Sequence, residues 1–307
     1  MSPSDASGAA EAGPDLLVAS ISDRDSLTVP GEARFGAQAV TLQGGKSYLV
    51  AFSLETVKRR DAPGNALYLA VSFRCAGGAD RSVASIGGTQ NLLPGEPVSL
   101  KNQLLVRPSG TGEYKCSVHA NSPYDDIAAV GTHLELDAEW RMFELGGPAF
   151  EANADTHLPS VLQPDESAYA LAVTVPEALH GADTLDVRAT LHLTTCTGVN
   201  GSREHGRTWC EREHLDLGGS TATAALQVTA IDSRGRVCGK IASVHQEVRI
   251  TRLRHHQLLH LERLRIPIPA KACGSEFRVT VRLENSGPAA LVMHATNSSL
   301  SVNASRA

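Results

Sequence analysis

Aromatic residues are scarce in this chain and make up only 4% of its 307 residues. This scarcity argues against a lectin-like groove built from many Trp and Tyr side chains. No apolar run approaches the roughly 18 residues that a membrane-spanning helix needs. The formal net charge of -5 gives the chain no general attraction to nucleic acid. With 42% hydrophobic and 20% charged residues, the composition is that of a soluble, globular protein.

Signatures of the common enzyme classes are also absent from the sequence. It contains no G-x-S-x-G nucleophile elbow, no H-E-x-x-H zinc motif, no phosphate-binding P-loop and no dinucleotide-binding fingerprint. We therefore predict no catalytic residues, no cofactor and no metal site, and a protein that is not an enzyme. The alternative is a hydrolase whose titratable groups converge only in the folded chain, a kind of site that sequence motifs do not reveal.

The N-terminus lacks the basic start and apolar core of a secretory signal. Residues 1–14 consist mainly of Ser, Ala, Gly, Pro and acidic residues, a composition that predicts a flexible lead. The six cysteines include no C-x-x-C pair, which favours three disulfides over a metal or redox site. We predict a secreted or cell-surface protein whose leader is absent from the sequence given. A cytoplasmic location is the alternative.

Short alternating segments separated by Pro and Gly predict an all-β fold. About eight such segments fit in the first 144 residues, and no long stretch has the period of a helix. The chain is long enough for two domains that each bury a core. We predict two tandem antiparallel β-sandwich domains of the immunoglobulin-like or jelly-roll-like Greek-key type, at residues 15–144 and 145–307. The clearest strand candidates in the first domain are 16–22, 37–43, 47–54, 66–75, 97–106, 113–120 and 132–140.

The two halves of the chain repeat one another. The segment 48–54 reads YLVAFSL and the segment 169–175 reads YALAVTV. Each leads to a cysteine 27 residues after its tyrosine, Cys75 in the first half and Cys196 in the second. A fixed order of extended segments used twice indicates two copies of one β domain.

A second match shows that the copies differ in length. GEYKCSVHANS at 112–122 corresponds to SEFRVTVRLENS at 275–286. The first match has an offset of 121 residues, whereas Tyr114 and Phe277 are 163 apart. The second copy therefore has about 42 additional residues, which we predict to form a disulfide-closed insertion at about 197–272. Insertions on a repeated scaffold are typical places for binding function.

The cysteines of the first half lie in two predicted strands. Cys75 continues an alternating face of large apolar residues, so it is expected to point into the core. We predict that it bridges Cys116 and pins two sheets together. Tyr114 precedes Cys116 by two residues, in a setting that resembles the tyrosine corner of immunoglobulin-like domains, which implies a Greek-key sandwich. The Trp that those domains place after their first cysteine is missing, and the 41-residue spacing between the cysteines is short for them.

The second half cannot form the same bridge, because Val279 stands where the first half has Cys116. Cys196 is one residue out of register with the alternating apolar face at 185–193, which predicts a bulge or strand end. Local spacing favours the pairs Cys196 with Cys210 and Cys238 with Cys273. The six cysteines allow fifteen pairings, so this is a preference.

One segment carries an unusual charge pattern, RITRLRHHQLLHLERLR at 249–265. Its leucines partly fit one side of a helix and partly the alternation of a strand. An exposed basic stripe would bind a polyanion; the alternative is a solvated face or a contact with the acidic first domain. The candidate binding residues are Arg249, Arg252, Arg254, His255, His256, His260, Arg263 and Arg265.

These observations predict a non-enzymatic extracellular binding or adhesion protein whose specific contact is made by the second domain. The expected partner is a protein or an anionic polymer at the cell surface, without specific nucleic-acid binding and without a transmembrane segment. The alternative is a structural subunit of a surface or particle assembly, in which sandwiches associate through their edge strands.

Overall fold

The computed structural model describes residues 15–62, 66–77, 83–122, 129–153, 161–176, 182–198, 203–204, 207–208, 210, 215–269, 273–274 and 276–305. The predicted flexible lead, residues 1–14, lies outside them. Within these ranges the chain forms nineteen β-strands and no α-helix, and hence no helix that could span a membrane.

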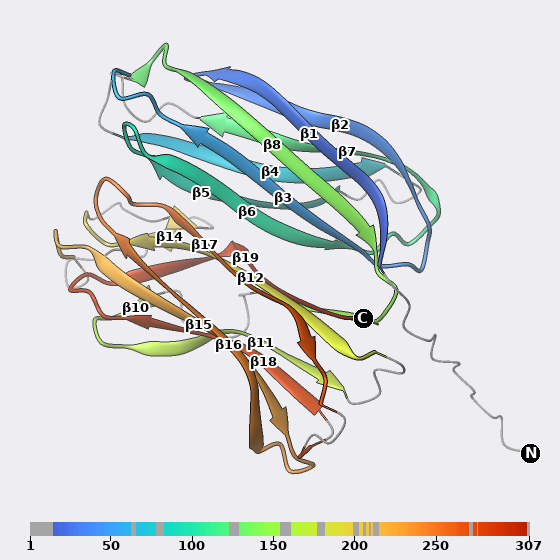
Figure 1. The fold of residues 1–307 in the computed structure, drawn as a ribbon. Coiled ribbons are helices and arrows are strands. Elements are labelled where there is room, and N and C mark those ends of the chain that lie inside the picture. Colours follow the sequence, from blue (N-terminus) through green and yellow to red (C-terminus); the bar gives the residue numbers. More distant parts are fainter. Residues whose placement is uncertain are drawn as a thin grey trace, which may run out of the picture.

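The first eight strands form two antiparallel sheets (Figure 1). One sheet has the order β1-β8-β3-β6 and the other the order β2-β7-β4-β5. The bounds are β1 Leu16–Thr28, β2 Gly31–Leu42, β3 Tyr48–Val57, β4 Leu67–Gly77, β5 Val83–Leu92, β6 Pro97–Val106, β7 Gly112–Ser122 and β8 His133–Glu144.

The remaining strands form a second pair of sheets and a small two-stranded ribbon of β13 and β14. One sheet has the order β10-β19-β12-β17, with β9 also paired to β19, and the other the order β11-β18-β15-β16. The bounds are β9 Ala149–Asn153, β10 Val161–Leu162, β11 Ser167–Pro176, β12 Thr184–Thr195, β13 Arg203–Glu204, β14 Arg207–Thr208, β15 Ser220–Ile231, β16 Val237–Ile250, β17 Gln257–Pro267, β18 Glu276–Asn285 and β19 Leu291–Ser305.

The two pairs of sheets share one topology. In the second pair we count β9 and β10 together as the first strand and leave out the ribbon of β13 and β14. In each pair, the first, eighth, third and sixth strands then form one sheet, and the second, seventh, fourth and fifth form the other. Eight strands in two such four-stranded sheets are a jelly roll. The predicted fold class, two tandem antiparallel β-sandwiches, is confirmed.

Each sandwich encloses its own apolar core because side chains alternate between the two faces of a strand. In β8 the alternate residues Leu134, Leu136, Ala138 and Trp140 are all at most 3% exposed. Trp140 packs edge-on against Phe73 of the opposite sheet. In the second sandwich, Leu185, Val187, Ala189, Leu191 and Leu193 are buried in the same manner.

The predicted repeat matches strands that are not equivalent. Residues 48–54 lie in β3, a central strand between β8 and β6, whereas residues 169–175 lie in β11, an edge strand beside β18. The equivalent of β3 is β12, which starts 136 residues later rather than 121. The match at 112–122 and 275–286 does join equivalent strands, β7 and β18. The similarity of the first pair arises because both are buried strands that begin near a tyrosine.

This slip by one strand also makes the predicted insertion at about 197–272 wrong. Strands β15, β16 and β17 occupy most of that range and are integral members of the two sheets. The largest difference in connection length is instead between the third and fourth strands. The connection between these strands has nine residues (58–66) in the first sandwich and 24 (196–219) in the second, where it includes β13 and β14.

The three disulfides join the predicted pairs: Cys75 with Cys116, which was expected from their core-facing strands, and Cys196 with Cys210 and Cys238 with Cys273, which local spacing favoured. Cys75 and Cys116 are nevertheless direct partners on neighbouring strands β4 and β7 of one sheet, with their Cα atoms 4.1 Å apart. The prediction that this bridge pins two sheets together is wrong, since both strands belong to the same sheet. Cys196 follows the end of β12, the strand end that its register predicted.

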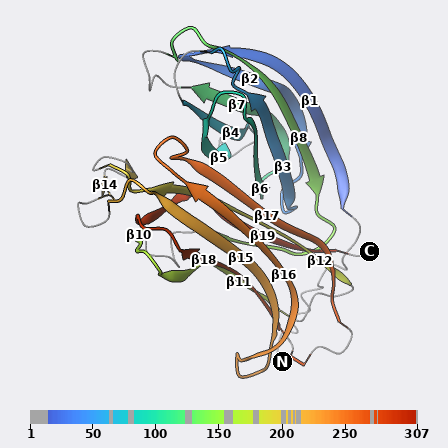
Figure 2. The same ribbon diagram turned by 60° about the vertical axis from the view of Figure 1, so that its left-hand side comes forward.

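The two sandwiches pack against each other along β5 and β6 of the first and β12, β17 and β19 of the second, as two views of the ribbon show (Figures 1 and 2). The chain passes between them from β8, which ends at Glu144, to β9, which begins at Ala149. Leu145 in this connection is 7% exposed and packs with Leu49 and Leu105. We propose that the boundary between the two domains lies after Glu144, as predicted.

Candidate functional site

The face of the second sandwich that meets the first is polar, yet it is buried. Thr190 and His192 of β12 point away from the core of their own sandwich, since Ala189 and Leu191 point into it. Their exposed fractions are 0% and 4%, because Gln103 of β6 in the first sandwich bonds to Thr190, and His256 and His294 pack against His192. Ser299 and Ser301 of β19 are buried on the same face. The surface between the sandwiches is therefore rich in hydrogen-bonding groups, as contacts between domains of one chain often are.

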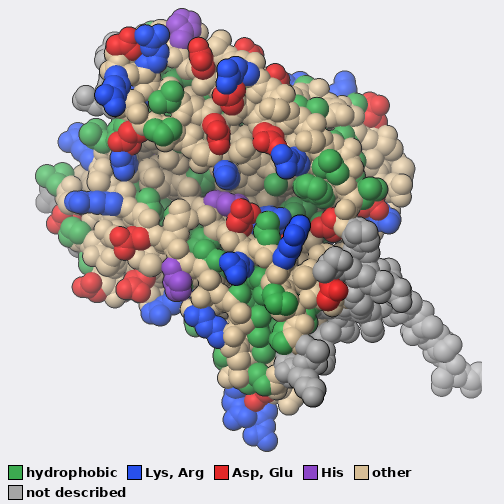
Figure 3. All heavy atoms as spheres, in the orientation of Figure 1, with side chains coloured by type: hydrophobic (Ala, Val, Ile, Leu, Met, Phe, Trp, Pro, Cys, Tyr) green, Lys and Arg blue, Asp and Glu red, His purple; other side chains and the backbone are tan. Residues whose placement is uncertain are grey.

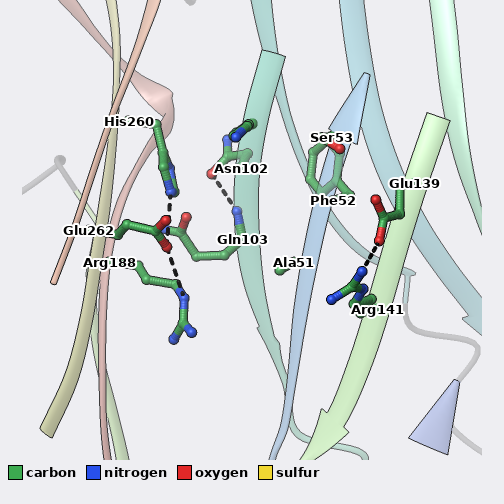
Figure 4. Close-up of a pocket in the computed structure, with 11 residues that line it drawn as sticks. Ala51, Phe52, Ser53, Asn102, Gln103, Glu139, Arg141, Arg188, His260 and Glu262 are labelled. Carbon is green, nitrogen blue, oxygen red and sulfur yellow. Dashed lines mark hydrogen bonds and ion pairs between the residues drawn. The ribbon is translucent and has the colours of Figure 1, made fainter. Parts of the chain in front are cut away.

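A pocket of about 300 Å³ opens beside this contact. Figure 3 shows the molecule hollowed between the two sandwiches, with charged side chains of both signs around the hollow. The outer face of β3, β6 and β8 forms one wall, and β12 and β17 form the other. We call it the interdomain pocket; its lining residues are Ala51, Phe52, Ser53, Lys101, Asn102, Gln103, Glu139, Arg141, Arg188, His260 and Glu262 (Figure 4).

Gln103 of β6 ties the floor of the pocket to the second sandwich. Its side-chain oxygen accepts a hydrogen bond from the hydroxyl of Thr190 at 3.1 Å, and its amide nitrogen donates to Ser299 Oγ at 3.3 Å. The neighbouring Asn102 turns toward the core and donates to the carbonyl of Gly87 at 2.7 Å. The buried amides of Asn102 and Gln103 thus have partners, as buried polar groups require.

The wall from the second sandwich carries Arg188, His260 and Glu262. The Glu262 carboxylate lies 3.8 Å from Arg188 Nε and 3.8 Å from His260 Nε2 (Figure 4). The pKa of Glu262 lies below its ordinary value, chiefly because of the neighbouring imidazole of His260, and Arg188 and Lys101 lower it further. His260 Nδ1 lies 3.0 Å from the hydroxyl of Thr190, which fixes the orientation of the ring.

The opposite wall carries Lys101, Glu139 and Arg141. Arg141 pairs with Glu139 at 2.6 Å (Figure 4), and both side chains remain substantially exposed. Lys101 is exposed and makes no ion pair with any residue that the structure describes. Three cations and two carboxylates thus line the interdomain pocket, and the cations come from both sandwiches. The arrangement suits a polar ligand with hydroxyl groups and negative charge.

The structure separates the eight residues predicted as a basic binding stripe. They lie in β16, in the connection 251–256 and in β17, so the segment is extended rather than helical. Arg254 pairs with Glu96 of the first sandwich at 2.6 Å, His256 is bonded to Asn91, and His255 lies against His256. His260 lines the interdomain pocket. The remaining four, Arg249, Arg252, Arg263 and Arg265, are exposed to solvent.

Half of the predicted stripe thus belongs to the contact between the sandwiches, which is the alternative that the sequence left open for it. His256 and His260 are four residues apart, a spacing that two zinc ligands have on one face of a helix. Here the segment is extended, so the spacing does not place them on one helical face. Across the described part of the chain, no group of three or more His, Cys, Asp or Glu side chains is arranged to hold a metal ion.

Sequence reasoning missed most of the lining of the interdomain pocket. Lys101, Arg141 and Arg188 are distant in sequence and occupy outward positions of strands, where a charged residue predicts only contact with water. One signal was present in β6: Asn102 stands at a core-facing position of an otherwise apolar alternation. A polar residue at such a position indicates a special contact.

No protein-family profile and no curated protein sequence matches this chain. Among solved structures it is similar to the CBM22-1–CBM22-2 tandem domain of Xyn10C from Paenibacillus barcinonensis, with 10% identity and a TM-score of 0.27 over 98% of this chain and 100% of that one. It is also similar to the VP2 subviral particle of infectious bursal disease virus, with 14% identity and a TM-score of 0.30 over 95% and 73%. We draw no conclusion about ligand or partner from likenesses of this size.

Proposed function

We propose that this protein is a non-enzymatic binding or adhesion protein of the cell surface or the extracellular space. In this proposal it holds an anionic, hydroxyl-rich polymer, such as an acidic polysaccharide, in the interdomain pocket. The observation that carries the proposal is the convergence of Lys101, Arg141 and Arg188 from both sandwiches on one open, polar pocket. Three disulfides support a location in an oxidising compartment.

The chemistry of the lining favours binding over catalysis. The two carboxylates, Glu139 and Glu262, are each engaged by a neighbouring cation, so both are suited to position charged groups. A general acid needs a raised pKa, whereas His260, Arg188 and Lys101 outweigh the effect of burial and lower the pKa of Glu262. The hydroxyl of Ser53 adds hydrogen-bonding capacity without a paired base, while the side-chain amides of Asn102 and Gln103 are engaged within the protein.

A test uses two polymers with the same backbone and different charge. Polygalacturonate carries a carboxylate on each sugar, and its fully methyl-esterified form carries none. We expect the protein to bind polygalacturonate more tightly than the ester, with an affinity that falls as salt is raised, because the pocket presents an excess of cations. Equal affinity for both polymers, or binding of neither, would count against an anionic polymer as the ligand.

A blocking variant tests the location independently of charge. Ser53→Trp places a large side chain in the interdomain pocket, whereas Ser99→Trp adds the same side chain to an exposed position on the outer face of the same sheet. The proposal expects Ser53→Trp to abolish capture of polygalacturonate and Ser99→Trp to leave it intact. Retained capture by a folded Ser53→Trp variant contradicts the pocket as the binding site.

The long edge strand β16 favours a second candidate function, a structural subunit of a surface or particle assembly. β16 runs over 14 residues and, among the described strands, has a sheet partner on one side only, namely β15. Unpaired edges of this kind are templates for pairing with another chain. Light scattering over a concentration series separates the two functions, because an assembling subunit gains mass with concentration whereas a binding protein of this design stays monomeric.

A further inference from the structure

A cluster of histidines lies at the contact between the two sandwiches, away from the lining of the interdomain pocket. The rings of His192 of β12 and His294 of β19 stack with their centroids 4.6 Å apart. His256, which directly precedes β17, lies beside them, with Nδ1 at 3.2 Å from His192 Nε2. His255 meets His256 edge-on at 4.9 Å. His192 and His294 are 4% and 6% exposed, so these rings are largely shielded from water.

His256 is the point at which the first sandwich holds this cluster. Its backbone N–H donates to Asn91 Oδ1 at 2.6 Å, and its carbonyl accepts from the N–H of Asn91 at 3.3 Å. Its ring lies edge-on to Tyr68 of β4, with centroids 5.0 Å apart. A change in charge at His256 therefore acts directly on the contact between the sandwiches, and a change at His192 acts through its hydrogen bond with His256.

The hydrogen bonds around His192 suit neutral rings. With the side-chain amide of Asn297 oriented so that Nδ2 donates to His192 Nδ1 at 3.3 Å, His192 carries its proton on Nε2. That proton is donated to Nδ1 of His256, which must then be unprotonated. If both rings were charged, two N–H groups would face each other across 3.2 Å.

Among the described residues, the charged groups that act on the pKa of His192 and His256 are the neighbouring histidines, and no carboxylate is among them. The carboxylate of Glu96 is engaged by Arg254 at 2.6 Å. The adjoining groove, which Tyr68 and Asn297 line, also contains Glu32, Arg74 and His119, and none of them forms an ion pair with the cluster.

We propose that the contact between the sandwiches is a pH-dependent closure, shut at neutral pH and opened when His192 and His256 take up protons. Burial and the neighbouring histidines lower the pKa of His256 to about 3, and burial lowers the pKa of His192 well below its ordinary value. A histidine in the open state titrates near 6.5. The closed state is thus fully favoured above pH 6.5 and loses stability as the pH falls from 6.5 toward the lowered values.

The size of the pH effect on closure follows from the lowered pKa values of the histidines in the closed state. Each such histidine lowers the ratio of closed to open molecules by up to about tenfold per pH unit below 6.5, which is up to about 30-fold at pH 5.0. The inference is independent of the proposed ligand, since none of the four histidines lines the interdomain pocket.

Hydrogen exchange measures the opening at the bonds that close the contact. The protection factors of the Asn91 and His256 amides should fall at least about tenfold between pH 7.5 and pH 5.0, after correction for the intrinsic exchange rate. The protection factors of the amides of β8 should stay unchanged. The double variant His192→Gln and His256→Gln should lose this pH dependence. His245→Gln, at an exposed position of β16, should retain it.

Protection of Asn91 and His256 that stays constant down to pH 5.0 would overturn the proposal. An unchanged pH response of the double variant would overturn it as well, because another group would then be responsible. If the double variant fails to fold, small-angle scattering of the natural protein decides: a radius of gyration that rises between pH 7.5 and 5.0 supports the opening, and a constant radius contradicts it.

Discussion

Gly88 of β5 and Leu258 of β17 meet across the contact between the sandwiches so closely that a Cβ atom on Gly88 would lie 2.6 Å from Leu258 Cδ2. Leu258 belongs to the second sandwich but packs against the core cluster of the first. The absence of a side chain at Gly88 therefore lets the two sandwiches approach at this point, where a larger residue would hold them apart.

The first prediction concerns this close approach. Gly88→Val should destabilise the contact by about 1–3 kcal/mol, because the added methyl groups overlap Leu258. Leu258→Ala should recover part of the loss in the double variant. A double-mutant cycle by denaturant unfolding measures this coupling. Gly198→Val is the matched control, since a Cβ atom there meets nothing within 4 Å. Strict additivity of the two changes would show that Gly88 and Leu258 do not press on each other.

The second prediction compares two disulfides. Cys75 and Cys116 are 41 residues apart in sequence, whereas Cys196 and Cys210 are 14 residues apart. Loop-closure entropy predicts that removal of the first bridge by paired Cys→Ala changes costs about 1 kcal/mol more than removal of the second. Thermal unfolding of the two double variants gives the difference. A larger loss on removal of the Cys196–Cys210 bridge would contradict this entropic ranking.

The third prediction concerns Glu262. Its pKa is lowered in the folded protein from an ordinary value of 4.5, so the carboxylate contributes stability above that value, and the contribution is lost as the pH falls through the lowered pKa. Glu262→Gln should therefore reduce the free energy of unfolding at pH 7, by less than about 1 kcal/mol because the group is half exposed. The difference from the natural protein should shrink as the pH falls below 4.5. Urea unfolding at several pH values tests this, with Glu247→Gln as the control; a difference that does not change with pH would refute the assignment to charge.

The fourth prediction separates the exposed part of the basic segment from the part that joins the sandwiches. Replacement of Arg252, Arg263 and Arg265 by Ala removes three exposed cations and spares the pair between Arg254 and Glu96. The free energy of unfolding should change by no more than about 0.5 kcal/mol per residue. Capture of polygalacturonate should weaken if the polymer extends beyond the interdomain pocket along this segment. Unchanged capture would confine binding to the pocket and remove these residues from the site.

The β-sandwich class follows from local patterns because alternation reports which residues face a core. The predicted strand 132–140 illustrates this, since every second residue from Leu134 to Trp140 is buried. Strand β5 was not predicted in the same way, because Gly87 and Gly88 interrupt its alternation. Gly88 makes room for Leu258 of the second sandwich, and Gly87 lies close to the backbone of Val71 in the first. Cys75 and Cys116 show a further limit, because a pairing of cysteines does not say whether their strands are neighbours in one sheet or lie in opposite sheets.

The contact between the sandwiches lies beyond sequence reasoning for a physical reason. Thr190 and His192 occupy positions that alternation assigns to solvent, and that assignment is correct for an isolated sandwich. Gln103 of the first sandwich bonds to Thr190, and His256 and His294 pack against His192. The interdomain pocket likewise consists of outward-facing charges on strands far apart in sequence, so no spacing along the chain could have grouped Lys101 with Arg188.

The fifth prediction tests the central claim, that one ligand is bound by residues of both sandwiches. Lys101→Ala alters the first sandwich, Arg188→Ala the second, and Lys115→Ala removes an exposed lysine of β7 outside the pocket. Titration of these three variants with polygalacturonate is the most direct measurement. The account predicts a loss of affinity of roughly fivefold or more for each of the first two, as charge-assisted contacts are worth about 1 kcal/mol or more, and no loss for Lys115→Ala. Equal affinities of all three variants and the natural protein would contradict it.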